Sequence, residues 1–151
     1  MSQENVEPTR VMPCYEEYVA VVRRMAACFS TGDYGGALTV CHPDIEMQDW
    51  HLILGAPDAP EDWYQGLEGA GRWVAEWLEL ASEPRIEPED FMPVDKERLV
   101  ITGMASGAAK RSEVSFEVPW AAVFTMRDGK VARMALFRTK AEALEAVGLS
   151  E

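Results

Sequence analysis

Apolar residues recur at every second position over one long stretch near the C-terminus. They run from Val114 to Met126, and a period of two is that of a β-strand with one buried face. Residues 127–130, Arg-Asp-Gly-Lys, then predict a tight hairpin turn, because glycine tolerates positive φ. Residues 131–138 return as a second strand with apolar residues on both faces. We therefore expect a sheet covered on both sides, which can form the wall of an internal pocket.

The first third of the chain follows the 3.6-residue period of helices. Apolar residues over 15–29 fall at i, i+3 and i+4, which predicts an amphipathic helix that ends at the Thr-Gly pair 31–32. Asp33 can cap a shorter second helix, which the His-Pro pair at 42–43 would end. Residues 45–50 alternate again and predict a short strand.

The middle of the chain predicts a loop, a third helix and two strands. Residues 54–65 contain two prolines among acidic residues and indicate an irregular loop. An apolar stripe over 70–81 predicts a helix. Residues 85–93 and 98–106 are expected to be strands joined by a turn at 95–96.

The order of these elements indicates the fold class. A capping-box sequence at 139–142 opens a last short helix that Gly148 ends. Helices grouped before a run of antiparallel strands predict an α+β domain, not a doubly wound parallel one. No glycine-rich phosphate loop follows a predicted strand, so the sequence gives no support for a nucleotide-binding fold.

Length and composition fit one domain. The chain has 151 residues, and we expect a flexible arm over 1–14 and a single domain over 15–151. The arm is polar and has no apolar core, so it does not predict a secretion signal. No run of about 18 apolar residues predicts a transmembrane helix.

The net charge and the cysteine content restrict the kinds of partner, metal site and compartment that we expect. A formal net charge of -12 argues against binding to nucleic acid, and it disfavours anionic membrane surfaces. The three cysteines, Cys14, Cys28 and Cys41, form no CxxC pair, so we expect neither a disulfide framework nor a metal site. A reduced, cytoplasmic protein is the corresponding expectation.

Three short segments carry a family resemblance. They are His-Pro-Asp-Ile-Glu at 42–46, Gly-Leu-Glu-Gly at 66–69 and Asp-Gly-Lys-Val-Ala-Arg-Met at 128–134, and 143–149 adds a fourth. In this order the chain resembles the nuclear transport factor 2-like (NTF2-like) superfamily, and within it the SnoaL-like polyketide cyclases and ketosteroid isomerases. The resemblance implies a cone-shaped barrel, in which a strongly curved, mainly antiparallel sheet wraps around helices and encloses an apolar pocket. The fold hosts many reactions and non-enzymes, so the resemblance does not specify a reaction.

Asp49 is the first candidate catalytic residue. It shares a strand face with Ile45 and Met47, and the resemblance places it at the position of the isomerase base. A carboxylate in a half-apolar site has a raised pKa that suits proton abstraction next to a carbonyl. A turn-forming carboxylate at a strand end is the alternative. His51 could join Asp49 as a proton shuttle, or be a structural histidine.

The resemblance also predicts what is missing. A ketosteroid isomerase stabilises its enolate with a tyrosine and a protonated aspartic acid. The matching positions here are Met25 and Ala122, and neither side chain donates a hydrogen bond. Steroid isomerisation by that mechanism is therefore not expected. Arg138, at the mouth of the implied pocket, could hold a carboxylate or oxyanion, or could be an exposed strand-end arginine.

Apolar side chains on the predicted helices and strands could line the pocket. A soft, aromatic lining suits a flat, polycyclic ligand, but the same residues could be an ordinary core. The candidate ligand-binding residues are Met25, Trp63, Trp73, Trp120, Ala122, Phe124, Met134 and Leu136.

Two classes of function follow. The chain could be a cofactor-independent cyclase or isomerase acting on a hydrophobic, polyketide-like carbonyl compound, with epoxide hydrolysis as a variant. It could instead be a non-catalytic small-molecule-binding or dimerisation domain. Under both we expect a homodimer formed through the outer face of the sheet, because apolar residues such as Val123 and Leu99 remain after one face is buried.

Overall fold

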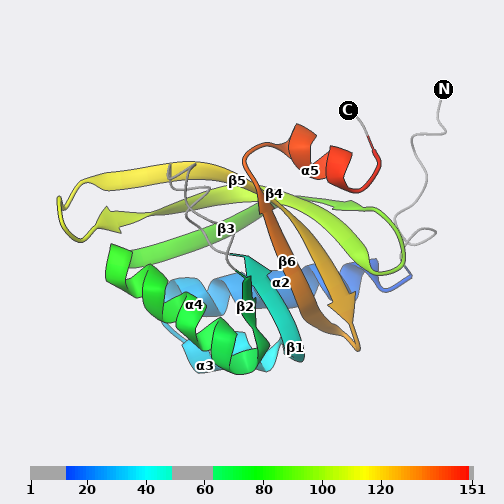
Figure 1. The fold of residues 1–151 in the computed structure, drawn as a ribbon, viewed down its shortest axis with the longest axis horizontal. Helices are drawn as coiled ribbons and strands as arrows, with labels where there is room; N and C mark the ends of the chain where they lie inside the picture. The colour runs from blue at the N-terminus through cyan, green and yellow to red at the C-terminus, as the bar shows by residue number, and fades with distance from the viewer. Residues whose placement is uncertain (1–12, 49–62, 150–151) are drawn as a thin grey trace.

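A six-stranded mixed sheet, curved and open, packs against helices on both faces (Figure 1). The structure, a computed structural model, describes residues 13–48 and 63–149. The helices are α2 (Tyr15–Thr31), α3 (Tyr34–Thr39), α4 (Gly66–Leu80) and α5 (Lys140–Ala146). The strands are β1 (Cys41–Gln48), β2 (Trp63–Gln65), β3 (Ala81–Pro93), β4 (Arg98–Ala109), β5 (Ser115–Arg127) and β6 (Lys130–Phe137).

The strand order is β2-β1-β6-β5-β4-β3, and β1 pairs with β6 in parallel while all other neighbours are antiparallel. This confirms the predicted α+β class and the curved, mainly antiparallel sheet. The sheet does not close on itself, because β2 and β3 form its two edges. The expected barrel is therefore an open, curved wall.

Helices α2, α3 and α4 lie on the inner side of this wall and α5 lies on the other (Figure 1). The main core fills the inner side and takes in Ile45, Leu99 and Trp77. A smaller core, which includes Val123 and Leu144, lies under α5.

Both residues cited for an outer-face dimer are thus covered within one chain. Val123 is buried beneath α5, and Leu99 is buried on the inner face. The homodimer remains a prediction that no contact in the structure tests.

Several predicted ends form as the sequence indicates. Gly32 ends α2 with a φ of 87°, and the Asp33 side chain accepts a hydrogen bond from the Gly36 N–H at 2.9 Å. Thr139 accepts from the Glu142 N–H at the start of α5. These local signals fix where each helix starts or stops, because they satisfy backbone groups that the helix leaves unpaired.

Other boundaries differ from the sequence prediction. The strand expected at 45–50 begins at Cys41, because Cys41 already pairs with Val131 of β6. Residues 63–65, expected in a loop, form β2 against β1. Both differences come from pairing between distant segments, which local periodicity does not record.

Candidate active-site cavity

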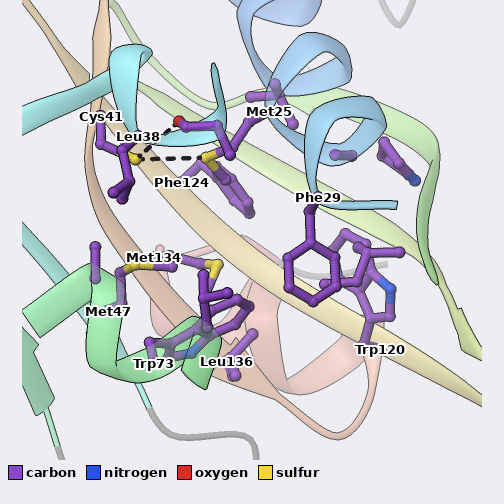
Figure 2. Close-up of a pocket in the computed structure, with 17 residues that line it drawn as sticks. Met25, Phe29, Leu38, Cys41, Met47, Trp73, Trp120, Phe124, Met134 and Leu136 are labelled. Atoms are coloured by element: carbon purple, nitrogen blue, oxygen red, sulfur yellow. Dashed lines mark hydrogen bonds between the residues drawn. The ribbon is translucent and has the colours of Figure 1, made fainter. Parts of the chain in front are cut away.

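A buried cavity of about 50 Å³ lies between the inner face of the sheet and helices α2, α3 and α4 (Figure 2). Every side chain that lines it is apolar or contains sulfur. The lining residues are Val22, Met25, Ala26, Phe29, Ala37, Leu38, Cys41, Met47, Ala70, Trp73, Val74, Ile86, Pro88, Trp120, Phe124, Met134 and Leu136.

Helix α2 supplies one wall because its apolar residues follow the helical period. Val22, Met25 and Phe29 fall on one stripe that faces the sheet. The Phe29 ring lies 5.8 Å from the rings of both Tyr34 and Trp73. At 4% exposure Phe29 is part of the core and of the cavity wall at once.

The sheet supplies the opposite wall through strand alternation. Phe124 of β5 lies beside Met134 of β6 in register, and both point inward. Met47 of β1 is also paired with Met134, so three adjacent strands contribute to one wall. Figure 2 shows Met134, Leu136 and Trp73 together on one side of the cavity, and Phe29 and Trp120 on the other.

Among the described residues that line the cavity, Cys41 alone has a titratable side chain. Its Sγ lies 3.8 Å from Met25 Sδ and 3.5 Å from the Ala37 carbonyl oxygen (Figure 2). Burial raises the pKa of the Cys41 thiol to about 11, despite an opposing effect of Lys130. At neutral pH Cys41 is therefore a neutral thiol, which makes it a packing residue and not a nucleophile.

Gln48 fixes the end of β1 beside the cavity. Its Oε1 accepts a hydrogen bond from the Leu136 N–H at 2.7 Å, and its backbone carbonyl accepts from Trp73 Nε1 at 3.0 Å. Gln48 is 6% exposed, and among the described residues it is the one buried polar residue. It joins β1, β6 and α4, and so holds two cavity-lining residues in place.

Six of the predicted ligand-binding residues line the cavity: Met25, Trp73, Trp120, Phe124, Met134 and Leu136. Ala122 is fully buried on the same sheet face, opposite Leu136, but outside the lining. Trp63 lies on β2, and the Arg133 guanidinium stacks over its ring at 4.5 Å. Trp63 therefore packs on the sheet edge and not on the cavity.

Of the three predicted catalytic residues, the described part of the chain includes Arg138 alone. Arg138 follows β6, is exposed, and donates its backbone N–H to the Glu142 carboxylate at 3.1 Å. Asp49 and His51 lie outside the described residues. Within the described ranges, no residue that lines the cavity is charged at neutral pH, and no cluster of three His, Cys, Asp or Glu side chains could hold a metal ion.

Polar pairs do occur outside the cavity. His42 Nδ1 accepts from the Asp44 N–H at 3.0 Å, so the ring proton lies on Nε2, which is 3.3 Å from an Asp128 carboxylate oxygen. This pair joins β1 to the β5–β6 turn. The His-Pro segment, expected to end the second helix, is thus part of β1, and α3 already ends at Thr39.

Sequence reasoning missed several lining residues. Phe29 and Val22 had a usable signal, because they share the helical stripe of Met25. Ile86 and Pro88 had no such signal, because the sequence alone does not show which helix packs against their strand. Among the described residues no helix has the length and apolar character that crossing a membrane would require.

Comparison with known proteins agrees with this geometry. A family model for the SnoaL-like domain matches residues 22–134. No curated protein matches the chain. Many solved structures do match, which places the fold among the NTF2-like proteins.

Three of these structures illustrate the likeness. An NTF2-like protein from Burkholderia xenovorans is 25% identical, with 87% of this chain and 95% of that one covered and a TM-score of 0.63. TerC, crystallised with polyporic acid, is 20% identical, with 87% and 98% covered and a TM-score of 0.68. A protein from Jannaschia proposed to be a SnoaL-like polyketide cyclase is 18% identical, with 81% and 85% covered and a TM-score of 0.66.

Proposed function

Because the chain belongs to the SnoaL-like family, we propose that it binds a small apolar molecule in the cavity between α2, α4 and the inner sheet face. The observation that carries this proposal is the lining. Seventeen of the described residues, from three helices and four strands, line the cavity, and all are apolar or sulfur-bearing. Apolar surface with few polar groups is the usual character of a small-molecule site.

The size of the cavity limits the ligand. At about 50 Å³ it is small beside the roughly 300–1,000 Å³ of ordinary ligand pockets. A single ring or a short chain matches this space, and a polycyclic compound would require the walls to move. Met25, Met47 and Met134 have flexible side chains that can adjust. The proposed ligands therefore include polyketide-like ring compounds. The polyporic acid co-crystallised with TerC and the polyketide cyclase proposed in Jannaschia are consistent with such compounds.

The test is a tryptophan-fluorescence titration with small aromatic compounds, since Trp73 and Trp120 line the cavity. The comparison uses two variants of α4. Ala70→Leu would fill the cavity, whereas Ala75→Leu adds the same side chain at an exposed position of the same helix. We expect Ala70→Leu to weaken binding at least tenfold and Ala75→Leu to leave it unchanged. Equal affinities in both variants would rule the cavity out as the site.

A second candidate function is catalysis on the bound molecule with Asp49 as general base. It is favoured by Met47, two residues earlier, which lies in the cavity wall. Asp49 would remove a proton next to a carbonyl, as in a cofactor-independent cyclase or isomerase. Product analysis during the same titration tests this: turnover lost in Asp49→Asn with binding retained supports an enzyme, and binding without turnover in the unmodified chain supports a carrier.

A further inference from the structure

A surface groove lies directly outside the buried cavity, between α2 and β3. It measures about 320 Å³ and is lined by Arg23, Ala26, Ala27, Ser30, Thr31, Arg85, Ile86, Glu87 and Pro88. Three residues, Ala26, Ile86 and Pro88, also line the buried cavity. The two spaces are therefore separated by the thickness of these side chains alone.

The contact between α2 and β3 is held at two separate points. Ser30 Oγ accepts from the Ile86 N–H at 3.0 Å and lies 3.3 Å from the Ile86 carbonyl oxygen. Farther along, the Tyr15 hydroxyl donates to the Phe91 carbonyl at 3.3 Å. In a strand every second residue turns its backbone to the same edge, so Pro88 is the next to face α2 after Ile86.

Pro88 has no N–H to offer at this edge. Opposite it, α2 presents Ala26 and Ala27, whose side chains are short. The stretch between the two hydrogen-bonded points thus combines small side chains with a missing donor. At this stretch residues Ala26, Ile86 and Pro88 line both the groove and the cavity.

The outer rim of the groove is locally positive. Arg23 and Arg85 line it against the single carboxylate of Glu87, in a chain whose formal net charge is -12. The Arg23 guanidinium also lies 4.9 Å from the centre of the Phe91 ring of β3. Among the described residues neither arginine forms an ion pair, so both guanidinium groups can take an outside anion.

We propose that the ligand is an amphipathic carboxylate, which enters between α2 and β3 and keeps its acid group at Arg23 and Arg85 while its apolar part occupies the buried cavity. This inference rests on the proposed function and adds the charged end of the ligand and its route. Arginine suits the role because its planar guanidinium binds carboxylates through paired hydrogen bonds.

The experiment compares 3-phenylpropanoate with the neutral 3-phenylpropanamide, titrated into the unmodified chain and into Arg23→Gln and Arg85→Gln. Arg24→Gln is the matched control, because Arg24 is an exposed arginine on the same helix but outside the groove. We expect each groove variant to weaken carboxylate binding roughly two- to fivefold and to leave amide binding unchanged. Glu87→Gln should strengthen carboxylate binding by a similar factor.

The outcomes separate the two proposals. If the amide binds as tightly as the carboxylate, or if Arg24→Gln weakens the carboxylate as much as the groove variants, the inference is wrong and the apolar site stands. If neither probe binds, and neutral toluene also fails to bind, both proposals fail.

A separate measurement, of binding and release rates, tests the entry route. Ala27→Phe adds a ring to the exposed groove side of α2 without changing a residue of the buried cavity. We expect slower association and slower release of the amide in stopped-flow fluorescence, with little change in its equilibrium affinity. Unchanged rates would place the entrance elsewhere.

Discussion

The backbone N–H of Leu136 is paired by a side chain, Oε1 of Gln48, at 2.7 Å. The parallel register of β1 and β6 runs through Met47 and Met134, and Gln48 extends the connection two residues farther along β6. A side-chain amide can do this because its oxygen accepts a hydrogen bond as a peptide carbonyl does. The wall of the cavity is thus completed by a side chain at the end of the strand.

Replacing Gln48 by Leu should destabilise the protein by about 1–3 kcal/mol, because the buried Leu136 N–H would lose this acceptor. Gln65→Leu on the neighbouring strand is the control, since Gln65 is exposed. Urea unfolding of both variants measures the difference. Equal stability of the two would mean that water replaces the amide at Leu136.

Phe29→Ala should cost about 3–5 kcal/mol of stability, because the ring is buried against Tyr34, Trp73 and Trp77. The variant should also enlarge the cavity and allow bulkier aromatic ligands to bind. Thermal unfolding and a titration with naphthalene measure the two effects. Leu67→Ala removes an exposed side chain on α4 and should change neither.

Cys41 should make the protein less stable at alkaline pH. Its folded pKa of about 11 exceeds the ordinary value of 9.0, so the folded state holds the thiol proton more tightly than the unfolded state. The stabilisation is complete below about pH 9 and is lost as the pH rises through 11, at up to about 1.4 kcal/mol per pH unit. Comparing the unfolding free energies of the unmodified chain and Cys41→Ala from pH 8 to 11 isolates this effect from other groups.

Thiol labelling gives an independent check on Cys41. Cys14 and Cys28 are half-exposed, whereas Cys41 is buried. We expect two thiols to react quickly with iodoacetamide at pH 8 and the third to react only on unfolding. Rapid labelling of Cys41 would show that the cavity opens to solvent.

Asp95 should stabilise the protein at neutral pH, through the turn between β3 and β4, and should lose this contribution at acid pH. Partial burial raises the pKa of its carboxyl group, but hydrogen bonds from the Glu97 N–H and from Arg98 outweigh this and leave the pKa lowered. The stabilisation is therefore present above the ordinary carboxyl range and is lost as the pH falls through the lowered pKa.

We expect Asp95→Ala to destabilise the protein by about 1 kcal/mol at pH 7 and by less near pH 3, as measured by urea unfolding. Asp90→Ala, at an exposed position of β3, is the matched control for loss of a carboxylate. A constant cost across the pH range would assign the effect of Asp95 to turn geometry alone.

Local patterns predicted much of the fold because each acts over a few residues. The long strand that contains Trp120 and the stop at Gly32 formed where the sequence placed them, although residues 120–124 are buried on both faces because a second core lies beneath α5. The parallel pairing of β1 with β6 could not be predicted, since it joins Cys41 to Val131, ninety positions along the chain. The pairing of β1 with β6 determines where β1 begins, and the pairing of β2 with β1 explains why Trp63 lies in a strand.

The same distinction applies to the candidate site. Met134 and Phe124 could be predicted, because strand alternation places them on the inner face. Gln48 could not, because a polar residue at a strand end gives no local signal of burial. Arg138 shares the parity of Met134 and Leu136, but β6 ends at Phe137, so the alternation that placed it at the pocket mouth does not continue to it.

The prolines of β3 have a consequence for how copies of this protein meet. On the edge that faces away from β4, Pro84 and Pro88 carry no N–H, and the N–H of Ile86 between them is taken by Ser30. A strand from another molecule would find no donor over this span, so it could not extend the sheet there. The prolines beside the cavity therefore also keep this edge of β3, part of which packs against α2, from pairing with a strand of another molecule.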